Sequence, residues 1–454
     1  MRLKLLTLAL ALAAISLPSH GEDLLDAYRE ARNNDPVLSQ ADASRLATGE
    51  GVTQARAQLL PQIGASMSRN QTNGGGQIGH SRSRTINGTL SQSVLDFSKY
   101  ANLKAAHSAS EAQDELYASA GQQLYVRVVA AYFGVLTSED GLTYAKANED
   151  AFRQQYEQSD QRFKVGLSAI TDVYQAKAYY EAAKSQTIAA QNTLNDSREA
   201  LAQITGKPTG DLKKLRDDLP MQPPSPADQD AWVKQALETN PDLLAQKSNV
   251  ETAQHNISAA RAAHLPTITA GVSYGKGAGW SEGNAAARYR DPASTTIGLT
   301  LNVPIFSGGA TQSRVREAIA NRDVRQDQLE QQKRAVERNT RNSYQTLVAG
   351  ISEIEARRLA VVSADAAYDA SQVGLEVGTR TVLDVLINQQ NLFNARQAYA
   401  IAKYNYLQNR LLLEQSAGSL EYNDVQDVNR LLTVDADAQL STEPATPSGE
   451  PQVR

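Results

Sequence analysis

The chain carries one nine-residue pattern twice: VGLSAITDV at residues 165–173 and VGTRTVLDV at residues 377–385. Each copy separates two long segments that contain no proline and whose apolar residues recur with a helical period. Gly166 and Gly378 suit the left-handed position that follows a helix, where a side chain would be strained. Each copy is therefore predicted to form the tip of a helical hairpin.

The residues after each glycine suit the start of a returning helix. Thr171 or Ser168 is the expected N-cap of the first return helix, and Thr381 is the expected N-cap of the second. Thr381 and Asp384 have the spacing of a capping box, and Asp172 falls in a first turn, where the helix dipole favours negative charge. Two explanations of these acidic residues stay open: local capping of the helices, and a gate built from the two tips.

The N-terminus has the pattern of a secretory signal peptide, predicted over residues 1–21. Arg2 and Lys4 precede an apolar run at 5–17, and small residues stand before a cleavage site at Glu22. This run is too short to serve as a membrane anchor. The sequence contains no cysteine, which excludes disulfides, thiol chemistry and a lipid-modified cysteine at the mature N-terminus.

Composition and motif spacing argue against an enzyme, a cofactor site and a nucleic-acid partner. The net charge is −5 over 454 residues, so the balance of charge gives no reason to expect nucleic acid. The five histidines show no metal-binding spacing such as HExxH, and no GK[ST] motif follows the glycine run at 74–76. We therefore expect neither catalytic residues nor a bound metal.

Proline and glycine positions divide the remaining chain into helices and strands. A helix over 22–58 is expected to break at 34–36, because proline disfavours helix in the residue before it. Two strands with two-residue alternation are predicted on either side of a loop at 72–83, the second ending at Leu95. The helix predicted over 98–164 would be about 100 Å long, far beyond the helices of an ordinary globular domain.

This arrangement is predicted to occur twice. Asn240-Pro241 repeats Asp35-Pro36 at an offset of 205 residues, and Gly378 repeats Gly166 at an offset of 212. Such matches indicate a tandem duplication, and we place the two repeats at 22–219 and 220–432.

The second repeat should supply two further strands. They are expected to start at Thr267 and Thr296, with a long glycine-rich connection at 275–292 between them. The tail at 433–454 is rich in Pro, Ser, Thr and Glu and is predicted to be disordered.

The four strands suggest how the chain meets a membrane. Each carries apolar residues on one face and Ser, Thr, Gly or Asn on the other, as in an outer-membrane barrel wall and unlike the many strands of a soluble sandwich. Four strands cannot close a barrel, and an open edge cannot face lipid. Two chains would supply eight strands and three would supply twelve; the polar inner faces favour the wider barrel.

On its motifs, the chain resembles the TolC family of outer membrane efflux and secretion channels over about 22–432. The matching motifs are LLPQ at 59–62, RF at 162–163 before the first tip, VPI at 303–305 before SGG at 307–309, and the second tip. The resemblance implies a mixed α and β membrane protein: a homotrimer with a twelve-stranded outer-membrane barrel continued by a periplasmic α-helical coiled-coil barrel. It also implies a periplasmic adaptor (membrane fusion protein) and an inner-membrane transporter as partners, in drug efflux or type I secretion.

The resemblance further implies a gate at the periplasmic entrance. Arg380 matches the arginine that links to a Thr-Asp pair of the other tip, here Thr171 and Asp172, and Asp384 matches a ring of carboxylates. Three copies of Asp384 near a threefold axis would repel one another, so a raised pKa is expected. The tip residues expected to contact the adaptor are Val165, Gly166, Leu167, Val377, Gly378 and Thr379.

Two positions depart from the family pattern. Ile387 stands where a second aspartate would follow Asp384, so we expect a weaker cation site at the entrance. Leu375 stands in place of a gate tyrosine. The alternative from another class is a soluble periplasmic coiled-coil adaptor, which would lack the duplicated pairs of lipid-facing strands.

Overall fold

A computed structural model describes residues 22–73, 80–216, 219–281, 287–290 and 292–432. The predicted signal peptide and C-terminal tail lie outside these residues. The chain divides into two compact units, one built from 40–119 and 241–336, the other from the segments before, between and after them. Each unit therefore takes residues from both sequence repeats, and the repeat boundaries themselves stay a prediction.

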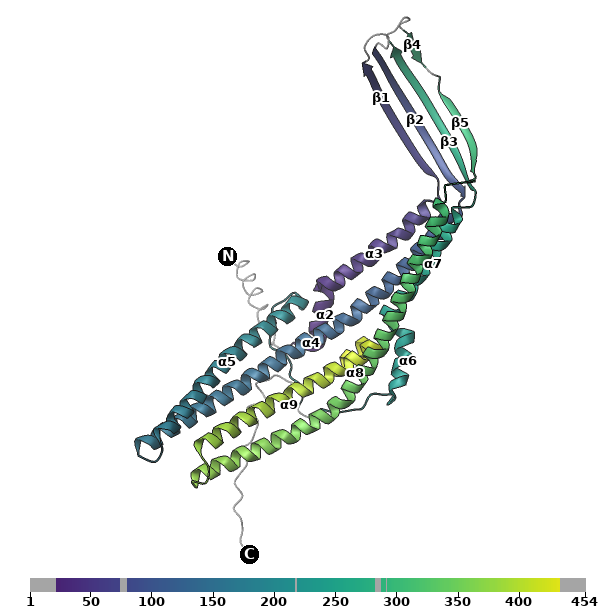
Figure 1. The fold of residues 1–454 in the computed structure, drawn as a ribbon. Helices are drawn as coiled ribbons and strands as arrows, with labels where there is room; N and C mark the ends of the chain where they lie inside the picture. Colours follow the sequence, from purple (N-terminus) through teal and green to yellow (C-terminus); the bar gives the residue numbers. More distant parts are fainter. Residues whose placement is uncertain (1–21, 74–79, 217–218, 282–286, 291, 433–454) are drawn as a thin grey trace, which may run out of the picture. The chain divides into compact units, whose positions relative to one another are not determined.

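The unit built from 40–119 and 241–336 contains an antiparallel sheet (Figure 1). Its described strands run in the order β1, β2, β3, and then β4 and β5, which both pair with the far edge of β3. The sheet thus has four strand positions, as predicted, and the last is interrupted. The strands are β1 (Gln62–Asn73), β2 (His80–Leu95), β3 (Thr267–Ser281), β4 (Ala287–Arg290) and β5 (Ser294–Asn302).

The strands are longer than the sequence pattern predicts. Residues 72–73 and 80–83 of the expected loop and 275–281 of the expected connection are strand, because β2 pairs with β3 from Ser81↔Ser281 onward. The glycines of β3 are held in this ladder by backbone hydrogen bonds, which need no side chain. Residues 74–79 and 282–286 of the two predicted loops lie outside the described residues.

The apolar face of the sheet is uncovered in the single chain. Ile63 in β1 is 80% exposed, and Ile297 and Leu299 in β5 are 77% and 72% exposed. Each residue follows the two-residue alternation that places its side chain on one face. A face of this kind must be buried against another apolar phase, because contiguous exposed apolar surface marks an interaction or membrane site.

Close helix packing supports the sheet within the same unit. The early turns of α4 (Phe97–Lys164) bury small side chains, Ala101, Ala105 and Ser108. Small residues of this kind let helices approach closely. Arg45 lies 2.9 Å from Asp42 and 3.8 Å from Asp114, and so ties α3 (Pro36–Ala57) to α4. The other helices with residues in this unit are α7 (Pro241–Ala262) and α8 (Ala310–Glu376).

The second unit is helical. It contains the later parts of α4 and α8 together with α2 (Leu24–Asn34), α5 (Ile170–Thr205), α6 (Gln229–Thr239), α9 (Val382–Ala417) and α10 (Tyr422–Asn429). Its core includes Leu124, Tyr132 and Phe133 of α4, all fully buried. The Phe133 ring lies 5.5 Å from that of Tyr404 on α9, which joins the two repeats.

In each repeat, a side chain next to the helix break before the proline bonds to the last residue of the return helix. Asn34 Nδ2 donates to the carbonyl of Thr205, the last residue of α5, at 2.8 Å; Thr239 Oγ1 donates to that of Ala417, the last residue of α9, at 2.7 Å. A left-handed glycine follows both helices, with φ of 75° and 77°. These bonds satisfy carbonyls that a helix end leaves without an intrahelical partner.

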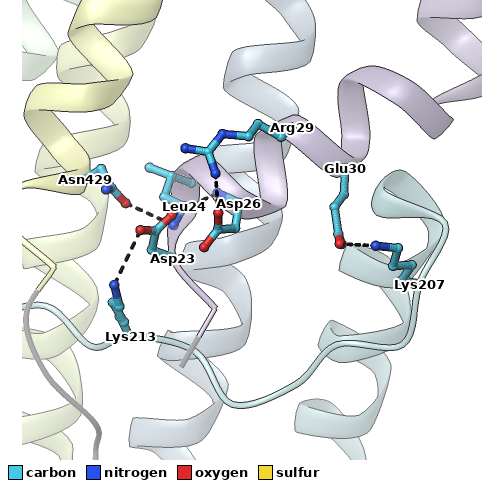
Figure 2. A network of polar contacts seen from close by, with 8 residues as sticks. All are labelled: Asp23, Leu24, Asp26, Arg29, Glu30, Lys207, Lys213 and Asn429. Carbon is cyan, nitrogen blue, oxygen red and sulfur yellow. Dashed lines mark hydrogen bonds and ion pairs between the residues drawn. The ribbon is translucent and has the colours of Figure 1, made fainter. Parts of the chain in front are cut away.

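The first described residues are held by the C-terminal helix (Figure 2). Leu24 N–H donates to Asn429 Oδ1 at 3.0 Å, and Asp23 caps α2 by accepting from Asp26 N–H at 2.9 Å. Lys213 Nζ lies 3.4 Å from the same Asp23 carboxylate, and Lys207 pairs with a glutamate of α2. Segments from both ends of the chain thus belong to one helical core.

Candidate functional site

The two tips have the backbone predicted for them. Gly166 and Gly378 have φ of +79° and +76°. Leu167 N–H donates to the carbonyl of Arg162 at 2.8 Å, and Thr379 N–H donates to that of Gly374 at 2.8 Å. Bonds that reach back five residues across a left-handed glycine define a Schellman motif, which ends the helix and turns the chain.

The second tip carries the predicted capping box. Thr381 Oγ1 accepts from Asp384 N–H at 3.2 Å, and the Asp384 carboxylate accepts from Thr381 N–H at 2.9 Å and from its hydroxyl at 2.8 Å. The backbone bond first, then the hydroxyl and nearby Arg380, lower the pKa of Asp384. In one chain, this direction is opposite to the rise predicted for a ring of three, because the bonds stabilise the carboxylate.

The first tip differs from the prediction. The N-cap of α5 is Ala169, and neither Thr171 nor Ser168 caps the helix with its side chain. Ser168 Oγ donates instead to Asp172 Oδ2 at 2.7 Å. The prediction was wrong because α5 begins at Ile170, one residue before Thr171, which leaves Thr171 inside the first turn.

Arg380 packs against its own hairpin. A Cβ at Gly374 would lie 2.5 Å from Arg380 Cγ, and the Arg380 amide donates to the Gly374 carbonyl at 3.0 Å. Gly374 therefore makes room for the arginine, a role that the sequence analysis missed although a lone glycine inside a helix signals close packing. Among the described residues of this single chain, Arg380 makes no hydrogen bond or ion pair with Thr171 or Asp172.

An apolar cluster joins the two hairpins below their tips. Phe152 of α4 and Ala176 of α5 are buried against Val382 and Leu386 of α9, and Leu375 packs at the edge. The position that holds a tyrosine in the family pattern thus carries an apolar contact. The sequence pattern gives no signal of this cluster, because its members come from two hairpins that lie far apart in the chain.

The cluster is flanked by aromatic side chains. The rings of Tyr156 and Tyr180 stack with their centres 6.2 Å apart, and both side chains are partly buried beside the cluster. Such pairs add about 0.5–1.5 kcal/mol beyond the burial of their area. This pair joins α4 to α5 within the first hairpin, beside the cluster that joins the two hairpins.

The tips expose apolar side chains beyond this cluster. Leu167 is 75% exposed, Val165 is 68% exposed and Val377 is 67% exposed. Asp384, Arg380 and Ile387 line one groove beside the second tip. Apolar points next to charged groups suit a surface that contacts another protein.

Among the residues that the structure describes, no cluster of three or more His, Cys, Asp or Glu side chains could hold a metal ion. None of the described helices is long and apolar enough to cross a membrane.

Comparisons with known proteins match nearly the whole chain. The profile of the outer membrane efflux protein family matches residues 27–207 and again 232–419. Outer membrane protein TolC of Escherichia coli (strain K12) is 35% identical over 94% of this chain and 88% of its own length. The alkaline protease secretion protein AprF of Pseudomonas aeruginosa is 29% identical over 89% of this chain and 86% of its own length.

A solved structure has the same fold. The outer membrane channel CmeC of Campylobacter jejuni superposes with a TM-score of 0.73 over 92% of this chain and 91% of its own, at 18% identity. Both halves of the chain match the family profile. The chain belongs to the outer membrane efflux protein family, and it is an outer membrane channel for efflux or secretion with a periplasmic helical domain.

Proposed function

We propose that three copies of this chain form one exit duct, with a twelve-stranded barrel in the outer membrane. The observation that carries this proposal is the sheet with two open ends. In the described chain, β1 pairs with β2 alone and β5 with β3 alone, while Ile63 and Ile297 at these edges are largely exposed. Backbone groups without partners cannot face lipid, so the edges of neighbouring copies must pair.

The number three follows from the inner face. Its Ser and Thr side chains and its glycines suit a water-filled lumen, whereas eight strands from two chains would leave an interior just filled by side chains. Chemical crosslinking of the detergent-solubilised protein tests this directly. A three-subunit species should appear as the largest product, and a product series that stops at two subunits would rule out the twelve-stranded barrel.

We further propose that the hairpin tips close the periplasmic entrance. Arg380 does not reach Thr171 and Asp172 within one chain, so the link would run between neighbouring subunits. Arginine can bind a carboxylate through two hydrogen bonds, and Asp172 engages only its Oδ2 with Ser168 in the described bonds. Weak links suit a gate, which must be closed at rest and open on docking.

Because the sequence contains no cysteine, disulfide crosslinking can test the gate proposal. Cysteines placed at Arg380 and Asp172 would be the only two in each chain. Oxidation should form disulfides between subunits and hold the channel closed, and reduction should restore opening. A disulfide formed within single chains, or none with intact trimers, would refute the intersubunit link.

The partners follow from the exposed tips. We propose that Val165, Gly166, Leu167, Val377, Gly378 and Thr379 contact a periplasmic adaptor, which bridges to an inner-membrane transporter. The cargo is proposed to be drugs, toxic small molecules or proteins. Charged substitutions at the most exposed of these side chains, such as Leu167→Asp, should abolish export in cells while trimers still insert and conduct.

A further inference from the structure

A groove lies where the helices meet the sheet, between the first turns of α4 and the last turns of α7. It is open to its surroundings and has a volume of about 630 Å³. Phe97 and Tyr100 line it from α4, and Leu265 lines it from the end of α7. These three side chains are 47%, 48% and 43% exposed, so the groove presents apolar and aromatic surface to its surroundings.

Cationic side chains line the same groove further from the sheet. Lys104 comes from α4 and Arg261 comes from α7. Neither Lys104 nor Arg261 has an ion-pair partner among the described residues, and none of the described residues that line the groove is acidic. A neighbouring lysine is different: the Lys99 ammonium bonds to Ser93 and the Gln58 carbonyl. The positive charges of Lys104 and Arg261 are therefore not balanced by an acidic side chain among the described residues of the groove.

The depth of these groups matches the layers of a membrane. α4 begins two residues after β2 ends, so Phe97 lies at the edge of the sheet and Lys104 about 10 Å beyond it. Arg261 stands six residues before β3 begins. The polar headgroup layer on each side of a bilayer is about 5–8 Å thick. If the sheet spans the hydrocarbon, the aromatic rings meet its boundary. The long side chains of Lys104 and Arg261 start just beyond the headgroup layer and can extend back to the phosphates.

We infer that this groove binds the phosphate headgroup of a phospholipid from the inner leaflet of the outer membrane. Arg261 and Lys104 bind the phosphate, and Phe97, Tyr100 and Leu265 cover the start of the acyl chains. Arginine suits a phosphate because its planar guanidinium presents paired donors. The inference rests on the proposed function, since it requires the sheet to sit in the outer membrane.

The other sequence repeat supplies a matched control. Arg56 stands in the last turn of α3, 205 residues before Arg261, and is also exposed, but it does not line the groove. A charge at this depth attracts any anionic membrane surface, so Arg56→Gln measures that general effect. The single variant Arg261→Gln removes the same one charge from the groove, so a larger loss of lipid binding in Arg261→Gln than in Arg56→Gln marks a built site.

Native mass spectrometry of full-length trimers with added phosphatidylglycerol tests the inference. We expect the double variant Lys104→Gln/Arg261→Gln to bind this lipid roughly thirtyfold more weakly than the unchanged protein, Arg56→Gln to bind it unchanged, and inorganic phosphate not to displace it. Equal binding by the double variant, an equal loss in Arg56→Gln, or displacement by inorganic phosphate would overturn the lipid site. Planar-bilayer conductance of the unchanged protein separates failure of the lipid site from failure of the proposed function. If the unchanged protein forms no conducting trimers, the proposed function fails as well.

Discussion

The two hairpin tips share one backbone and differ in their side-chain chemistry. Both turn through a left-handed glycine and a bond that reaches back five residues. In the second tip Thr381 caps the helix and holds Asp384, whereas the first tip has Ala169 at the cap and Ser168 holds Asp172. Backbone sterics demand glycine in both copies, while the cap is worth only about 1 kcal/mol and is free to diverge.

The helix breaks show the same contrast. In the first repeat Asp35 is buried, caps α3 and takes two bonds from Arg127, at 2.7 and 3.1 Å. In the second repeat Asn240 stands there, and its amide donates to the Ser416 carbonyl at 3.2 Å. One fold thus tolerates an ion pair or a neutral amide, provided that the buried polar atoms find partners.

The largest expected effect tests the shared backbone. At Gly418 an added Cβ would lie 2.6 Å from the Thr239 carbonyl oxygen and 2.7 Å from Asn240 Cα. At Gly206 it would lie 3.0 Å from Asn34 Cβ, so the clash is milder and does not involve a neighbouring backbone atom. Gly418→Ala should therefore destabilise by roughly 2–5 kcal/mol and Gly206→Ala by about 1–2 kcal/mol. Thermal loss of the trimer on gels measures both, and equal losses would refute the distinction.

The ion pair of the first repeat should matter next. Burial raises the pKa of Asp35, but the bonds from Arg127 and the Leu38 amide outweigh it, so the net pKa is lowered. Asp35→Ala should cost about 2 kcal/mol at neutral pH, less than the usual roughly 3–5 kcal/mol for breaking a buried pair, since Arg127 is 33% exposed.

The pH dependence of that variant checks the cause. A lowered pKa stabilises the fold above the unfolded value, near 3.9, and this contribution is lost as the pH falls through the folded value. The gap in thermal stability between the unchanged protein and Asp35→Ala should therefore close below about pH 4. A gap that persists there would assign the effect to packing.

The gate distinguishes the tips by function. An exposed ion pair is worth about 0.2–1 kcal/mol, so three copies reach at most about 3 kcal/mol, roughly a hundredfold shift in the open population. Arg380→Ser or Asp172→Ala should raise conductance in planar bilayers and admit large antibiotics, with the trimer intact. The double variant should add little, because both changes break one link. Normal conductance in both single variants would leave these residues as local packing.

The caps themselves give a smaller effect. Thr381→Ala removes the cap of α9 and should destabilise by about 1 kcal/mol. Ser168→Ala removes a hydroxyl that does not cap α5 and should change stability by less than about 0.5 kcal/mol. Thermal melts of the two variants side by side measure the difference, and a larger loss for Ser168→Ala would reverse the assignment of caps.

The smallest effect concerns cation block at the entrance. Asp384→Asn should weaken block by multivalent cations from the periplasmic side, because it removes one ring of charge. Since Ile387 follows in place of a second acid, the block to be lost is modest. As the pH is lowered, block of the unchanged protein should persist to about pH 4 if the capping bonds dominate the pKa of Asp384. If repulsion among the three copies dominates, block should already be lost at a higher pH.

Sequence by itself determined the hairpins, the duplication and the strands. Gly166, Gly378 and the prolines after Asp35 and Asn240 act through local sterics, which any fold must obey, and the alternation of β1 and β5 follows from strand geometry. Motif resemblance supplied the family.

Only tertiary structure decided the rest. The ends of the strands depend on pairing between β2 and β3, which lie almost two hundred residues apart. This pairing continues the ladder through glycines that in the sequence suggest a loop. The N-cap of α5, the place of Arg380 over Gly374 and the cluster around Phe152 and Leu386 depend on which surfaces meet. Such contacts join residues with no relation in sequence, because burial rewards proximity in space and is indifferent to distance along the chain.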